Sequence, residues 1–176
     1  MSDTGIELVR RAERARREKR LADAHRHLVE AVAVCRQARA RFELVLALKG
    51  LGQSSGTCPG AARPLYEEAV AICREGGDAL TLAHTVRHLG DVHRHAGRLE
   101  LAEPCCQVAL ALYRSHEDTR PLALANAIRP LAILKQNAGE TEEARRLWQE
   151  AKDLYTAANV QEGVAGCSTW LARLGG

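Results

Sequence analysis

Apolar residues recur along this chain at helical spacing, in two patterns that alternate from one end to the other. In the first pattern, an alanine is followed by a larger residue four positions later, by another alanine after seven and by an aliphatic residue after ten. These positions share one face of an α-helix, because a helix turns once every ~3.6 residues. The four leading alanines are Ala24, Ala62, Ala102 and Ala144.

The second pattern lies between these segments and places two pairs of apolar or small residues seven positions apart. Leu82-Ala83 precedes Leu89-Gly90 in this way, and comparable pairs begin at Leu44, Leu124 and Val164. The leading alanines of the first pattern are 38, 40 and 42 residues apart. Two kinds of helix therefore alternate in a repeating unit of about forty residues.

Glycine and proline residues mark the ends of these predicted helices. Gly97 and Gly139 each fall between the two helices of a unit, where glycine readily takes the left-handed conformation that ends a helix. The corresponding turn at 56–60 is two residues shorter, which predicts looser packing of that hairpin. Pro130 falls within a predicted helix, where it removes one backbone hydrogen bond and is expected to kink the helix. The predicted helices cover 4–18, 20–38, 41–55, 61–75, 79–96, 99–115, 121–138, 141–157 and 161–174.

The run from Leu89 to Ala102, LGDVHRHAGRLELA, resembles the middle of a tetratricopeptide repeat, with Gly97 at its turn. The run from Leu131 to Ala151 matches equally well. The resemblance covers nearly the whole chain, although a unit of about forty residues exceeds the ~34 usual in this family. It implies a single all-α domain over 1–176, a right-handed α-solenoid of about four antiparallel helical hairpins and a terminal helix. The units are 4–38, 41–75, 79–115, 121–157 and the terminal helix 161–174.

Small residues on the repeated faces predict that neighbouring helices approach each other closely. The leading alanines, together with Gly52 and Gly90, are therefore expected in the core. Trp148, Tyr66 and Leu28 occupy the larger position of the first pattern, and we expect them to fill the space between hairpins.

One face of the helix predicted over 79–96 is polar. Because each residue advances about 100° around a helix, four polar side chains fall within about 60° of one another: His84, His88, Asp91 and His95. The resemblance implies that the first helix of each hairpin supplies the concave, ligand-binding surface. The implied lining is Lys49, Gln53, His84, Arg87, His88, Asp91, Arg94, His95, Asn126, Arg129, Gln136 and Asn137.

Lys49, Arg87 and Arg129 each stand two residues before the leucine of their own repeat, so stacking would align them as a cationic ladder. Asp91 is the one acidic residue among them. Cations beside amides suit carboxylates. The sequence therefore predicts a non-enzymatic protein–protein interaction module, an adaptor or scaffold. Its ligand would be a protein or peptide segment, acidic or ending in a free carboxylate. The alternative is a merely solvated surface.

The histidines allow a different function, a metal-binding or metal-sensing helical repeat. His84 and His88, and likewise Asp91 and His95, are four residues apart, a spacing that can hold Zn²⁺. The pattern is not the H-E-x-x-H of a metalloprotease. The chain also lacks the phosphate-cradling G-x-x-x-x-G-K-[ST] and G-x-G-x-x-G. No catalytic residue, resident metal or cofactor is predicted.

Charge argues against a nucleic-acid partner. The net charge is only +3, and the most basic stretch, from Arg10 to Arg20, also contains Glu13 and Glu18, as a solvated helix face does. The first predicted helix is so polar that the sequence leaves open whether it caps the array or is partly frayed. A helical repeat that reads one RNA base per unit needs a stricter period than 38 to 42 residues.

Cysteine usage and hydropathy bear on location. The six cysteines include no C-x-x-C pair, the start of the chain lacks a secretory pattern, and no apolar run approaches the ~20 residues of a membrane helix. A reducing cytoplasm is therefore the predicted location, with no membrane partner. Val164 and Leu171 give the last helix an apolar face, which could pair with a second copy in a homodimer or simply close the stack.

Overall fold

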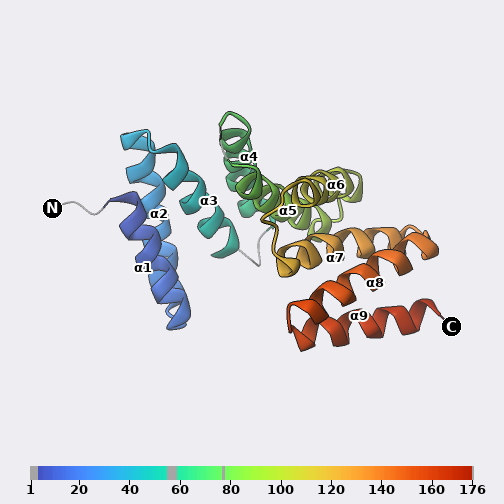
Figure 1. Cartoon of the computed structure of the whole chain (residues 1–176). Coiled ribbons are helices and arrows are strands. Elements are labelled where there is room, and N and C mark those ends of the chain that lie inside the picture. Colours follow the sequence, from blue (N-terminus) through green and yellow to red (C-terminus); the bar gives the residue numbers. More distant parts are fainter. Residues whose placement is uncertain (1–3, 55–58, 77, 176) are drawn as a thin grey trace. The chain divides into compact units, whose positions relative to one another are not determined.

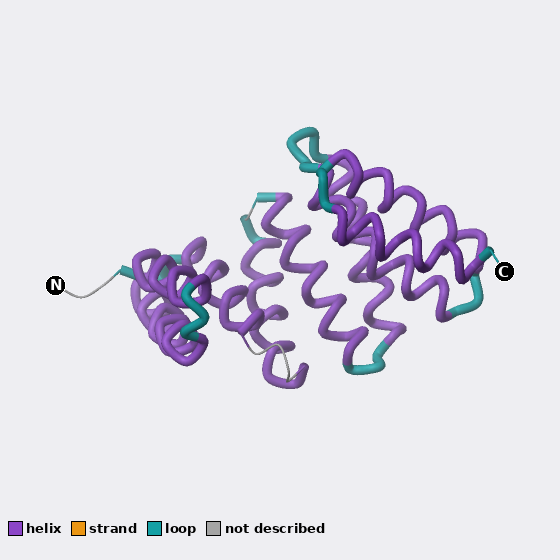
Figure 2. The backbone as a smooth tube through the Cα atoms, turned by 90° about the horizontal axis from the view of Figure 1, so that it is seen from below, coloured by secondary structure: helices purple, strands orange, loops and turns teal. Residues whose placement is uncertain are grey.

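The structure, a computed structural model, describes residues 4–54, 59–76 and 78–175. Helices and connecting loops make up this described part (Figure 2). The helices, labelled in Figure 1, are α1 (Gly5–Arg17), α2 (Leu21–Ala38), α3 (Arg41–Ser54), α4 (Pro59–Arg74), α5 (Ala79–His95), α6 (Leu99–Ser115), α7 (Pro121–Asn137), α8 (Thr141–Ala157) and α9 (Gln161–Leu174). Each end lies within two residues of its predicted position. The predicted turn at 56–60 falls mainly outside the described residues.

The chain divides into two compact units, Met1–Asp78 and Ala79–Gly176. In the first unit, α1 packs against α2 and α3, and α3 packs against α4. In the second unit, α5 pairs with α6 and α7 with α8, while α6 also contacts α7 and α9 packs against α8. Within both units, the paired helices are the hairpins that the alternating patterns predict.

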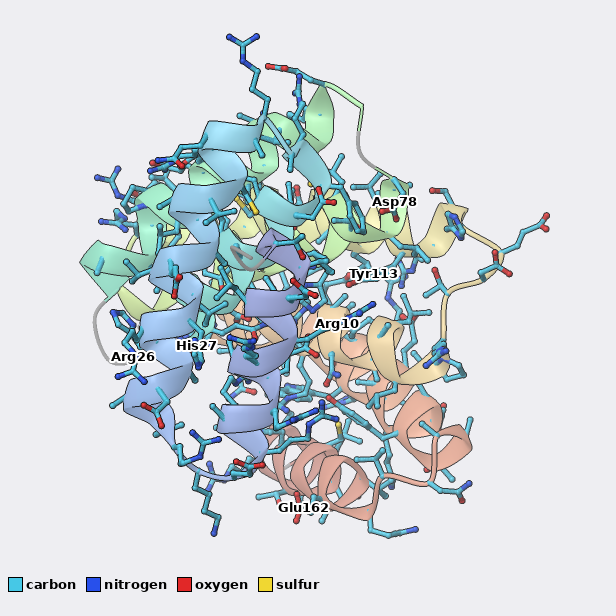
Figure 3. All side chains as sticks on the ribbon, turned by 90° about the vertical axis from the view of Figure 1, so that its left-hand side faces the viewer. Arg10, Arg26, His27, Asp78, Tyr113 and Glu162 are labelled. Atoms are coloured by element: carbon cyan, nitrogen blue, oxygen red, sulfur yellow. The ribbon has the colours of Figure 1, made fainter. Side chains whose placement is uncertain are left out.

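Helix α1 is a complete helix despite its polar sequence, so of the two alternatives left open by the sequence, partial fraying does not apply. Thr4 and Glu7 form a capping box in which the Glu7 N–H donates to Thr4 Oγ1 (3.4 Å) and the Thr4 N–H donates to Glu7 Oε2 (2.9 Å). Leu8 and Ala15 of this helix are buried. On the neighbouring helix, Arg26, labelled in Figure 3, is largely exposed and pairs with Asp23.

The turns between paired helices use left-handed backbone, as the glycine positions predict. Gly97 and Gly139 have φ values of 71° and 77°. Lys19 occupies the equivalent place between α1 and α2 with φ 60°. A side chain in this region is strained, because its Cβ crowds the following carbonyl. The turn between α1 and α2 therefore has left-handed backbone although a lysine, and not a glycine, occupies it.

The repeated small and large positions form the core. The four leading alanines are at most 3% exposed, and Leu28, Tyr66 and Trp148 at most 2%. Glycine at 52 lets α3 approach α4, because an added Cβ would lie 2.7 Å from Tyr66 Cε2. The predicted packing is therefore confirmed in both units.

Four of the five described cysteines are buried thiols: Cys35, Cys73, Cys106 and Cys167. Burial raises the pKa of Cys106 to about 12, so its sulfur stays protonated and weakly nucleophilic at neutral pH. Cys106 faces the core at the larger position of its repeat. It is a packing residue, as its spacing predicts.

We expect Cys106 to resist alkylation in the folded protein, because the reactive thiolate is scarce far below pH 12 and the side chain is covered. Mass mapping after iodoacetamide treatment at pH 8 tests this, with the partly exposed Cys105 as the neighbouring control. Both thiols should react in urea. Equal labelling of the two in native buffer would contradict the buried position.

Helix α9 completes the second unit. Trp170 stacks on Trp148 with ring centroids 5.9 Å apart and planes 13° apart, and the Arg173 guanidinium lies 4.6 Å above the Trp170 ring. Val164 and Leu171 are partly buried against the core of this unit. The apolar face of the last helix thus packs within the chain. Across the described residues, no helix is both long and apolar enough to cross a bilayer.

Candidate functional site

The predicted lining residues lie on three helices. Lys49 and Gln53 are on α3 in the first unit, where Gln53 Oε1 accepts a hydrogen bond from Arg16 (2.9 Å). The other ten are on α5 and α7, which are neighbours in the second unit (Figure 1). That Lys49 continues the cationic surface from the second unit stays a prediction.

A pocket of about 190 Å³ opens between α5 and α7. Six of the predicted residues line it, and two apolar residues complete the wall. The lining consists of Arg87, Asp91, Arg94, His95, Asn126, Arg129, Pro130 and Ile133. The α7 members are spaced like one helix face, at i, i+3, i+4 and i+7. That spacing from Asn126 is the sequence signal that could have identified Pro130 and Ile133.

Asp91 bridges two of the pocket arginines. Its Oδ2 lies 3.3 Å from Arg87 Nη1, and its Oδ1 lies 3.3 Å from Arg94 Nη2. The three side chains are 15% to 21% exposed, so solvent screens these pairs less than it would on an open surface. Asp91, the one acidic residue of the predicted lining, therefore forms ion pairs with both Arg87 and Arg94 on its own helix.

Each of these arginines also contacts the histidine that follows it. Arg87 Nη2 lies 2.8 Å from His88 Nε2, and Arg94 Nη2 lies 2.9 Å from His95 Nε2. Arginine can only donate, so both Nε2 atoms accept in these contacts. The Arg94 Nε is buried and has no hydrogen-bond partner within the described part of the chain. A buried donor left unpaired is costly, by about 1–3 kcal/mol.

The two arginines of the ladder have matching surroundings. Burial raises the pKa of Tyr113, labelled in Figure 3, and the neighbouring Arg87 opposes part of the rise. Burial likewise raises the pKa of Tyr155, and Arg129 opposes part of that rise. In both hairpins, the cation on the first helix therefore lies beside a buried phenol on the second helix.

The α7 amides are fixed by buried aromatic residues. The Tyr155 hydroxyl donates to Asn126 Oδ1 (2.7 Å), and Trp148 Nε1 donates to Gln136 Oε1 (3.1 Å). Asn126 lines the pocket, whereas Gln136 and the exposed Asn137 do not. Tyr155 could not be assigned to the site from the sequence, because its partner Asn126 lies 29 residues away in the chain.

The metal hypothesis finds no matching geometry. No three His, Cys, Asp or Glu side chains gather into a possible metal site anywhere in 4–54, 59–76 or 78–175. His84 and His88 pack edge to face with ring centroids 4.5 Å apart, and arginines contact the other two members of the stripe, Asp91 and His95. His93 is buried, and its Nδ1 accepts from Arg98 Nε (3.2 Å).

Comparison with known proteins agrees with this architecture. No family model matches the chain. The protein KINESIN LIGHT CHAIN-RELATED 3 of Arabidopsis thaliana is 25% identical over 100 residues, which cover 51% of this chain. The match spans only 15% of that plant protein.

Two solved structures share the fold. One is a signal transduction ATPase with numerous domains and a tetratricopeptide repeat sensor, from Pyrococcus horikoshii: TM-score 0.78, 14% identity, 93% of this chain and 26% of that one. The other is a Podosopora anserina protein with nearly identical TPR-like repeats: TM-score 0.76, 17% identity, 99% of this chain and 87% of that one. The predicted tetratricopeptide-like fold of helical hairpins is confirmed.

Proposed function

We propose that this chain is a non-enzymatic protein-binding module whose α5–α7 pocket holds a carboxylate of a partner protein or peptide. Proteins with TPR-like repeats generally mediate protein–protein interaction. The observation that carries the proposal is the composition of the pocket, which gathers Arg87, Arg94 and Arg129 around a single Asp91. The local charge is therefore positive, although the chain as a whole is only slightly basic.

The chemistry of these side chains favours a carboxylate ligand. A guanidinium offers several N–H groups in one plane, which match the two oxygens of a carboxylate. Arg129 is exposed at this surface, and the Arg94 Nε is buried without a protein acceptor in the described chain. Asn126 adds an amide held in place by Tyr155. A carboxylate can therefore meet both an exposed cation and an amide that is already fixed.

The state of the cysteines also fits this role. No disulfide joins the five described cysteines to one another, as expected for a reducing compartment such as the cytoplasm. A homodimer through α9 is not part of the proposal, because Val164 and Leu171 already pack against the chain's own core.

Charge reversal of Arg129 provides the direct test. With a fluorescein-labelled penta-glutamate peptide as the probe, we expect Arg129→Glu to weaken binding at least about tenfold, because it replaces an exposed attractive charge with a repulsive one. Arg146→Glu is the matched control, since Arg146 is an exposed arginine of α8 outside the pocket. Fluorescence anisotropy at two salt concentrations measures both variants.

Equal weakening by the two substitutions, or none by either, would refute the pocket as the binding site. Comparing the peptide with a free and with an amidated C-terminus then separates recognition of acidic side chains from recognition of a chain end. Circular dichroism of each variant shows whether the helices are retained.

A further inference from the structure

We propose that Asp91 is an internal stand-in for the ligand's carboxylate, occupying Arg87 and Arg94 until an anion from a partner displaces it. The inference rests on the proposed function and adds a regulating contact to it. It follows from three features of the pocket: the length of the two ion pairs, the independent support of the arginines, and the donor that Asp91 leaves unpaired.

The ion pairs are long for charge-assisted hydrogen bonds. Both measure 3.3 Å, whereas N⁺–H···O⁻ contacts of full strength measure about 2.7–2.9 Å. Asp91 shares its two oxygens between two arginines on its own helix, three and four residues away. Such pairs along a helix contribute only weakly to its stability. A ligand carboxylate that is free to choose its position can bind either guanidinium at a shorter distance.

The arginines do not depend on Asp91 for their positions. Arg87 is also held by His88 Nε2 at 2.8 Å and lies beside the Tyr113 hydroxyl. Arg94 is also held by His95 Nε2 at 2.9 Å. An arginine that keeps these contacts stays at the pocket after Asp91 is neutralised. The carboxylate therefore competes for the cations more than it positions them.

Asp91 also leaves part of the pocket unsatisfied. It contacts Arg94 through Nη2, while Arg94 Nε stays buried with no acceptor from the described residues. Arg129, the third cation of the lining, has no ion pair with Asp91 among the pairs observed. An incoming carboxylate at the exposed Arg129 would gain donors that the internal carboxylate does not use. This difference allows exchange of one anion for the other.

The test removes the charge of Asp91 and keeps its shape. We expect Asp91→Asn to bind the labelled penta-glutamate peptide about tenfold more tightly than the wild-type chain, because the competing anion is gone. Asp118→Asn is the matched control: Asp118 is an exposed carboxylate outside the pocket, and its substitution changes the net charge by the same amount. We expect less than about a twofold change for this control, since exposed distant charges are screened by salt.

Weaker binding by Asp91→Asn would show that the carboxylate positions the arginines and would overturn the inference. An equal gain in Asp91→Asn and Asp118→Asn would reduce the effect to net charge and overturn it as well. The proposed function fails separately, when Arg129→Glu leaves binding unchanged. If Arg129→Glu weakens binding but Asp91→Asn does not strengthen it, the pocket stands and only the internal stand-in is refuted.

Discussion

Replacing Trp148 with alanine is expected to lower the free energy of unfolding of the second unit by about 3–5 kcal/mol, the usual cost of truncating a buried tryptophan. The side chain is 1% exposed, stacks on Trp170 and donates to Gln136. Its removal leaves a cavity and an amide without its partner. Since small domains are stable by only about 5–15 kcal/mol, this loss is a large part of the total.

Urea denaturation followed by circular dichroism measures this loss without relying on tryptophan fluorescence. Trp148→Phe is the informative control, because it keeps an aromatic ring in the core while it removes the donor to Gln136 and part of the indole's volume. Trp170→Ala should cost less, since that ring is partly exposed. Equal losses for Trp148→Ala and Trp170→Ala would contradict a central position for Trp148.

Gly163→Ala is expected to lower the free energy of unfolding by about 2 kcal/mol, although alanine is the better helix former. An added Cβ would lie 2.4 Å from Cγ and 2.5 Å from Cδ1 of Tyr155. The ring cannot easily move, because it is 2% exposed and its hydroxyl is bonded to Asn126. Either the tyrosine or the whole of α9 must shift.

Gly166→Ala is a matched control on the same helix. Nothing lies within 4 Å of the Cβ that it would gain, so the substitution should stabilise by about 0.5–1 kcal/mol through helix propensity alone. Thermal unfolding of both variants gives the comparison. A melting temperature that rises in both would show that α9 does not pack against Tyr155 as described.

The helices and their pairing could be predicted because each depends on local periodicity. In each unit, two alanines seven residues apart predict the buried face of one helix, and the apolar pairs predict that of the other. Ala144 and Trp148 are buried, as this spacing predicts. Lys19 shows the limit of such rules. Its left-handed backbone joins the packed helices α1 and α2, and no glycine in the sequence predicts that conformation there.

The candidate site was predictable only along each helix. Angular spacing predicted the stripe that contains Asp91 and His95, and these two residues line one pocket with Arg87 and Arg94, which the family resemblance added to the predicted lining. The ion pairs inside the pocket could not be predicted, because the sequence does not show with which neighbouring side chains Asp91 pairs. The contact of Tyr155 with Asn126 joins residues 29 positions apart and depends on how α8 lies against α7. Only the tertiary structure supplies it.

Tyr155, whose hydroxyl donates to Asn126, also contacts the last helix: its ring packs closely against α9 at Gly163, where no side chain intervenes. An anion that hydrogen-bonds to Asn126 would favour the same ring position that α9 requires. Ligand affinity and the ordering of the final helix would then be thermodynamically linked, and the coupling would act equally in both directions. Amide hydrogen exchange along α9 would slow when the pocket fills, and loosening α9 would weaken capture at a distance.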